Sequence, residues 1–102
     1  MDAILSDIHG NLEALEAVLS AAQACGADRV ICLGDIVGYG PNPVECAERL
    51  RECDLFIAGD WDLAAVAADD PPWNEHLVHQ VHWVRAIPSI PPIHGDRLKY
   101  GR

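Results

Sequence analysis

The hydrophobic positions over the first 70 residues alternate between two patterns. Three short apolar runs, at residues 2–6, 29–33 and 55–58, have no helical period, and each predicts a buried β-strand. The segments between them, about 12–25 and 43–52, carry apolar residues at three- and four-residue spacing, which predicts amphipathic helices. Strands that alternate with helices of this length are typical of a parallel sheet with right-handed crossovers. The predicted fold class is therefore α/β, a βαβαβ parallel-sheet unit.

Turn and cap residues mark the expected ends of these helices. Asn11 and Asn42 are good N-cap residues, Pro43 suits the first helical position, and Gly26 is expected just past the end of the first helix. A short third helix is expected at residues 63–68, before two aspartates and two prolines end it.

The composition changes after about residue 75. Up to that point the sequence has 15 acidic and three basic residues, and beyond it one acidic and four basic residues. Residues 87–92 hold three prolines, which excludes a regular helix or a central strand there. We therefore divide the chain into a half-domain at 1–70 and an atypical Pro- and His-containing tail at 71–102. The tail could be a covering segment, a partner-binding segment, or sequence that has lost its native reading frame.

Overall charge and hydropathy exclude several classes of protein. The net charge of −9 argues against binding nucleic acid or an anionic membrane through bulk electrostatics. No apolar run approaches the roughly 18 to 20 residues of a membrane span, and no signal peptide is visible, so we expect a cytoplasmic protein. No close Cys-x-x-Cys pair suggests a zinc knuckle, and we expect reduced, mostly buried thiols at Cys25, Cys32, Cys46 and Cys53.

Metal-ligating side chains follow each predicted strand. Asp7 and His9 come after the first strand, Asp35 after the second and Asp60 after the third. Because the carboxyl ends of parallel strands meet at one edge of a sheet, these side chains should converge there. In an extended backbone Asp7 and His9 would point the same way, and the two oxygens of Asp35 could bridge two ions. Any one of them alone could be an ordinary turn residue, but together they predict a centre for two divalent ions, Mn, Fe, Ni or Zn.

Other polar and aromatic residues are weaker candidates. Asn11, Gly38 and Tyr39 are expected to line the substrate cleft beside the metal ligands. His94 could swing into the site. We expect His76, His79 and His82 to be surface or partly satisfied histidines rather than metal ligands. We expect Trp73 and Trp83 to be packing residues.

Three motifs resemble a known family. Asp7-x-His9, Gly34-Asp35-x-x-Gly38 and Gly59-Asp60-Trp61-Asp62 are similar to the first three signature blocks of the calcineurin-like metallophosphoesterases, closest to their small bacterial and archaeal phosphodiesterase branch. The resemblance covers about residues 1–68. It implies that this chain is the N-terminal half of an α/β/β/α sandwich that hydrolyses phosphate esters at a dinuclear metal centre.

The resemblance also implies roles for single residues. Asp7 and His9 would bind the first metal, Asp35 would bridge both metals and Asp60 would bind the second, so Asp35 and Asp60 are the expected catalytic residues. The family usually has Gly-Asn-His where this chain has Gly59-Asp60-Trp61, and an indole gives up no proton to a leaving group. No Gly-His-x-His block is present, so we expect the enzyme to be truncated.

These observations predict a metal-dependent phosphoesterase acting on a phosphomonoester or phosphodiester small molecule through a metal-bound hydroxide. A bare βαβαβ unit leaves one sheet face poorly covered, so we also expect a homo-oligomer or a partner chain. The alternatives are a metal-binding module or subunit without catalysis, and a frameshifted remnant.

Overall fold

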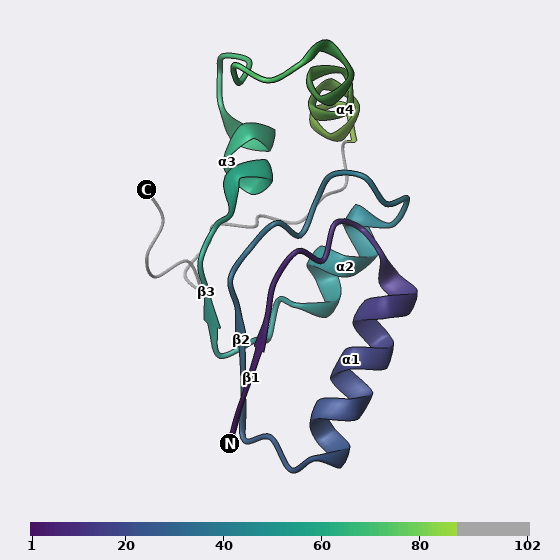
Figure 1. Ribbon diagram of the computed structural model, residues 1–102, viewed down its shortest axis with the longest axis vertical. Coiled ribbons are helices and arrows are strands. Elements are labelled where there is room, and N and C mark those ends of the chain that lie inside the picture. The colour runs from purple at the N-terminus through teal and green to yellow at the C-terminus, as the bar shows by residue number, and fades with distance from the viewer. Residues whose placement is uncertain (88–102) are drawn as a thin grey trace.

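The computed structural model of the chain is described for residues 1–87 (Figure 1). Its three strands and four helices confirm the predicted α/β class. In chain order they are β1 (Asp2–Leu5), α1 (Leu12–Ala24), β2 (Arg29–Cys32), α2 (Pro43–Arg49), β3 (Leu55–Phe56), α3 (Asp60–Val66) and α4 (Glu75–Arg85).

The sheet has the order β1-β2-β3 and is parallel throughout. Leu5, Cys32 and Phe56 pair across it in one row and are at most 8 % exposed. They belong to one apolar core with residues of α1 and α2, which lie on the same side of the sheet in Figure 1. Because successive strand residues point to opposite faces, the neighbouring row that contains Ile4 lies on the other face, and Ile4 is 62 % exposed.

The helix ends differ from the sequence prediction in ways that local hydrogen bonds explain. Asn11 caps α1 as expected, because its Oδ1 accepts a hydrogen bond from the N–H of Ala14 at 3.1 Å. Asn42 makes no such side-chain cap bond, and α2 ends at Arg49 rather than near residue 52, in a turn where the Cys53 N–H donates to the Leu50 carbonyl. The prediction that the third helix starts at residue 63 is wrong, since α3 already begins at Asp60.

Helix α4 was not predicted, and it lies in the part of the chain with unusual composition. The Asn74 Oδ1 caps it by accepting from the Leu77 N–H at 3.0 Å. Val81 and Val84 of α4 are 1 % and 2 % exposed, and both pack in the same apolar core as the sheet residues. The other predictions for residues 88–102, among them the proline-rich stretch and His94, lie outside the described residues.

One arginine fastens α4 to α3. The Nε and Nη2 of Arg85 donate to the carbonyl of Ala64, at 3.1 and 3.0 Å, and Nη1 donates to Asp70 Oδ1 at 2.8 Å. A cation at the carbonyl end of a helix satisfies acceptors that have no partner within the helix. The first part of the tail is therefore built into the fold by both apolar packing and polar contacts.

The cysteines are free thiols, as expected, and three of the four are buried. Burial raises the pKa of Cys32 to about 12 and that of Cys46 to about 11. Cys25 is exposed. Within residues 1–87, the structure has no helix of the length and apolar character that a bilayer crossing requires.

Candidate metal centre

The candidate site is built on two loops that are joined backbone to backbone. The loop after β1 and the loop after β2 continue the pairing of their strands beyond the ends of the sheet. Five hydrogen bonds link them: Asp7 N to Gly34 O, His9 N to Asp35 O, Gly10 N to Ile36 O, Gly40 N to His9 O and Asn42 N to Gly10 O, with lengths from 2.7 to 3.2 Å. The approach is close enough that a Cβ on Gly10 would lie 2.7 Å from the carbonyl oxygen of Gly40. The two loops therefore form one unit.

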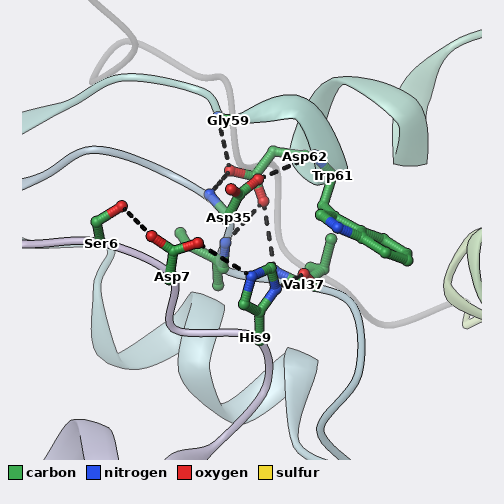
Figure 2. Close-up of polar contacts among 9 residues, drawn as sticks. Ser6, Asp7, His9, Asp35, Val37, Gly59, Trp61 and Asp62 are labelled. Carbon is green, nitrogen blue, oxygen red and sulfur yellow. Dashed lines mark hydrogen bonds and ion pairs between the residues drawn. The ribbon is translucent and has the colours of Figure 1, made fainter.

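Three of the four predicted metal ligands come together on this unit. One ligand atom from each of Asp7, His9 and Asp35 lies within 4.8 Å of the other two. His9 Nε2 lies 3.3 Å from Asp7 Oδ1 (Figure 2). Two trans ligands of a small divalent ion are about 4 to 4.4 Å apart, so the cluster is close to the size that such an ion needs.

The second nitrogen of His9 sets which ring atom faces the cluster. His9 Nδ1 lies 3.0 Å from the carbonyl oxygen of Val37, and a carbonyl only accepts hydrogen bonds. The Nδ1 atom therefore carries the proton, and in the neutral imidazole Nε2 directs a lone pair at the Asp7 carboxylate. Two acceptors at this distance repel each other unless a cation or a proton lies between them. Metal-bound histidines are commonly held by such a second contact, so the donor set fits a divalent ion.

The backbone at these positions is left-handed. Asp7, His9, Asp35 and Tyr39 have φ values of 56°, 49°, 56° and 66°, and they are the non-glycine residues with positive φ in the described part of the chain. The prediction that Asp7 and His9 share an extended stretch is therefore wrong. They converge because two tight turns, held by the paired loops, aim both side chains at one point. A left-handed residue costs roughly 1–2 kcal/mol, and such strain gathers at functional sites.

Asp35 lies against the first turn of α3. Its Oδ1 accepts a hydrogen bond from the Trp61 N–H at 3.0 Å. Gly59 leaves no space here, because a Cβ at that position would lie 2.6 Å from Asp35 Cγ. Asp60 is exposed at the first position of α3 and is not part of the three-residue cluster. Its role as a ligand of a second metal stays a prediction.

Asp62 is a functional residue that the sequence analysis missed. It is 2 % exposed, and its carboxylate accepts four backbone N–H bonds: from Asp35 at 2.6 Å, Ile36 at 2.9 Å, Gly59 at 3.1 Å and Val37 at 3.4 Å (Figure 2). Burial raises the pKa of Asp62, and the four N–H donors oppose that shift. The side chain thereby fixes the backbone that presents Asp35. An acid at the third position of a helix that starts after Gly59 was the available signal.

Trp61 belongs to an aromatic cluster. Its indole lies 4.9 Å from the rings of both Tyr39 and Trp73, between ring centroids, and 6.2 Å from the His9 ring. Figure 2 shows the indole pointing away from the Asp35 carboxylate. The side chain is 7 % exposed and packs as part of the core.

Two of the three predicted cleft residues line a cavity beside the candidate metal cluster. This cavity, of about 440 Å³, is lined by Asn11 and Tyr39 together with Asp7 and His9, but not by Asp35. Gly38 is not among its lining residues. Its φ is +94°, and the Trp61 ring lies 2.6 Å from where a Cβ would be, so this position accepts only glycine.

The histidines of α4 lie apart from the cluster, and the structure corrects one of the tryptophan predictions. His82 Nε2 lies 2.9 Å from Asp70 Oδ1, and neither His76 nor His79 belongs to the cluster of possible metal ligands found in residues 1–87. Trp73 packs on Trp61, as expected. Trp83 is 49 % exposed, so the packing role predicted for it is wrong.

The family model of the calcineurin-like phosphoesterase superfamily domain matches residues 2–99. The chain belongs to this superfamily. The match includes α4 and most of the tail of unusual composition. This extent agrees with the contacts that Val81, Val84 and Arg85 make with the rest of the fold.

Three relatives are longer than this chain. The chain is 37% identical over 102 residues to an uncharacterised protein of Methanocaldococcus jannaschii, which covers 98% of this chain and 40% of that protein. It is 42% identical over 55 residues to the phosphodiesterase YfcE of Escherichia coli strain K12, covering 46% of this chain and 30% of that one. The crystal structure of a metallophosphoesterase from Sphaerobacter thermophilus superposes with a TM-score of 0.58 and 32% identity, over 85% of this chain and 41% of that one. The chain thus spans about two fifths of the first and third of these relatives.

Proposed function

We propose that this chain carries the metal-binding part of a phosphoesterase site that acts on small-molecule phosphate esters. The observation that carries the proposal is the Asp7–His9–Asp35 cluster, in which the Val37 carbonyl directs the free nitrogen of His9 toward a carboxylate. A bound divalent ion would polarise the phosphoryl oxygens and make a water acidic enough to attack phosphorus. Mixed carboxylate and imidazole ligands favour Mn, Fe, Ni or Zn over Ca or Mg.

In this proposal each side chain has a distinct task. Asp7 and His9 would hold the first ion. Asp35 would contribute to both ions if a second one binds, and Asp60 would be a further ligand of that second ion. Asp62 acts only through the backbone of Asp35, which it holds by the 2.6 Å bond to the Asp35 N–H. Four backbone donors around one buried carboxylate keep this scaffold in place before any ion binds.

The replacement of the leaving-group histidine by Trp61 narrows the expected substrates. An indole N–H donates a hydrogen bond but supplies no proton at neutral pH. The leaving alkoxide must then depart without help from this position. Among esters that bind equally well, we therefore expect turnover to rise as the leaving group becomes a more stable anion.

The wider setting of the chain is also a proposal. The exposed apolar side chains of Ile4 and Leu33, 62 % and 42 % exposed, support a second copy or a partner chain that covers the open sheet face. Four free cysteines support a reducing compartment such as the cytoplasm. The family match through residue 99 supports a native tail over a frameshifted one.

Calorimetric titration with Mn²⁺ and hydrolysis of bis-p-nitrophenyl phosphate test the proposal together. The full chain should bind Mn²⁺ and hydrolyse the diester only when Mn²⁺ is present. Asp35→Asn should lose both, and Asp69→Asn, which changes an exposed acid of the turn after α3, should lose neither. Equal Mn²⁺ binding by the wild type and Asp35→Asn would overturn the proposal. Binding at the cluster without hydrolysis would favour the alternative of a catalytically silent metal-binding module.

A further inference from the structure

A second hollow adjoins the cavity beside the metal cluster. It has a volume of about 390 Å³ and is lined by Tyr39, Gly40 and Pro41 of the loop after β2 and by His79, Gln80 and Trp83 of α4. The three loop residues also line the cavity beside the metal cluster. The two hollows therefore adjoin at Tyr39, Gly40 and Pro41, which line both of them.

The walls of this second hollow, here called the aromatic groove, are unusually apolar for a solvent-facing surface. Tyr39 is 58 % exposed and Trp83 is 49 % exposed. Among residues 1–87 these are the two large aromatic side chains that count as exposed, and both line the groove. Apolar surface left in water carries a free-energy cost that a stacked ligand would remove.

The Tyr39 ring is held in place relative to the metal cluster. Its backbone N–H donates to Gln80 Oε1 at 2.9 Å, which ties the loop to α4. The ring meets the His9 ring edge-on at 4.9 Å between centroids. The left-handed φ of 66° further restricts the loop at this residue. The Tyr39 ring therefore lies between the groove and the cluster, in edge-on contact with the His9 ring.

The chemistry of the lining indicates what the groove takes. It contains no lysine or arginine, so it offers no site for a phosphate. Aromatic faces stack flat heterocycles, and His79 and Gln80 add groups that form hydrogen bonds with the edge of such a ring. The net charge of −9 disfavours a long polyanion, so a single nucleotide is preferred here over a nucleic acid strand.

We propose that the aromatic groove binds the base of a nucleotide whose phosphate lies at the Asp7–His9–Asp35 cluster. This inference rests on the proposed function, because the cluster must bind the phosphate through its metal. The substrate class is thereby narrowed from phosphate esters in general to nucleoside phosphate esters. Tyr39 and Trp83 determine specificity in this proposal and take no part in the chemical step.

Calorimetric titration of the full chain in the presence of Mn²⁺ tests the proposal with three probes: adenosine 5′-monophosphate, ribose 5-phosphate and adenosine. Stacking on aromatic side chains contributes enough for the nucleotide to bind roughly 5- to 150-fold more tightly than ribose 5-phosphate. Trp83→Ala should remove about tenfold of that preference, and Trp83→Phe should restore most of it. Tyr39→Asn should act similarly, since asparagine tolerates a left-handed backbone and keeps the N–H that Gln80 accepts. Val66→Ala, which shortens a 57 % exposed side chain away from the groove, should leave the preference unchanged.

The outcomes separate the two proposals. Equal affinity for the nucleotide and for ribose 5-phosphate in the wild type overturns the base site, as does a preference that survives Trp83→Ala. In both cases Mn²⁺-dependent binding of ribose 5-phosphate, lost in Asp35→Asn, keeps the proposed function. The opposite pattern is also informative. If adenosine binds in a way that depends on Trp83, the base site is supported. If ribose 5-phosphate binds equally well with and without Mn²⁺, the proposed phosphoesterase site is overturned. Circular dichroism of each variant confirms that the fold is intact.

Discussion

The Asp62 carboxylate gives the sharpest test of how the site is held. Replacing it with asparagine keeps one carbonyl oxygen, which can serve the N–H groups of Ile36 and Val37 that Oδ1 now accepts. The amide NH₂ would stand where Oδ2 accepts from Asp35 and Gly59, at 2.6 and 3.1 Å, so donors would face donors. Two of the four hydrogen bonds are therefore lost and replaced by a repulsive contact.

The expected loss of stability follows from these counts. A hydrogen bond to a charged group contributes about 1.5–3 kcal/mol, so two bonds amount to roughly 3–6 kcal/mol. Part of this is recovered because the neutral amide does not bear the burial penalty that raises the pKa of the carboxylate. We expect Asp62→Asn to lower the free energy of unfolding by about 2–4 kcal/mol, within the usual total of about 5–15 kcal/mol for a domain.

Urea unfolding in the presence of EDTA, followed by circular dichroism, measures this loss without a contribution from metal. With a slope of about 1.3 kcal/mol per molar urea, the midpoint should fall by roughly 1.5–3 M. Asp69→Asn makes the same chemical change at an exposed position, and it should shift the free energy by no more than about 0.5 kcal/mol. If both variants unfold at the same urea concentration, the buried carboxylate does not hold the loop, and the account of how Asp35 is positioned fails.

Three further predictions concern other parts of the structure. Gly59→Ala should reduce Mn²⁺ affinity in calorimetry at least about tenfold, because its Cβ would lie 2.6 Å from Asp35 Cγ and displace that ligand; unchanged affinity would contradict the close approach. The hydrogen bond from His82 lowers the pKa of Asp70, so the stability from this contact is present above about pH 4 and is lost as the pH falls through the folded-state pKa. Asp70→Asn should therefore flatten the fall in melting temperature between pH 4 and 2, and an equally steep fall would refute this. In the native state at pH 8, Cys25 alone should react with a thiol reagent, whereas all four cysteines should react in denaturant. A second rapidly reacting thiol in the native state would contradict the burial of the other three cysteines.

The order of the elements and the convergence of the ligands could be predicted from the sequence, because both follow from periodicity. Short apolar runs separated by amphipathic segments leave few alternatives to a parallel sheet, and such a sheet brings Asp7 and Asp35 to one edge. The second helix was predicted to end near residue 52, but α2 ends at Arg49. The helical spacing of apolar residues continues to Leu50, whereas the backbone there already forms the turn in which the Cys53 N–H donates to the Leu50 carbonyl.

The remaining features depend on contacts between residues distant in sequence. The left-handed angles at His9 arise from bonds to a loop that is about 30 residues away, and no local pattern indicates them. Asp62 lies in a recognised motif, yet its importance comes from four donors that only the fold brings around it. Helix α4 was missed because its mixture of histidines and apolar residues resembles neither pattern found earlier in the chain.

The left-handed backbone at Asp7, His9 and Asp35 bears on how such a chain changes over evolutionary time. Glycine adopts these angles without the steric cost that any side chain incurs, so mutation to glycine at each position would relieve strain while deleting a ligand. Drift without selection for chemistry would therefore favour glycine here, and gain stability by doing so. The chain instead keeps two carboxylates and an imidazole at its strained positions. The proposed ion site would account for this choice of residues, since glycine would relieve the backbone strain at these three positions but could not bind an ion.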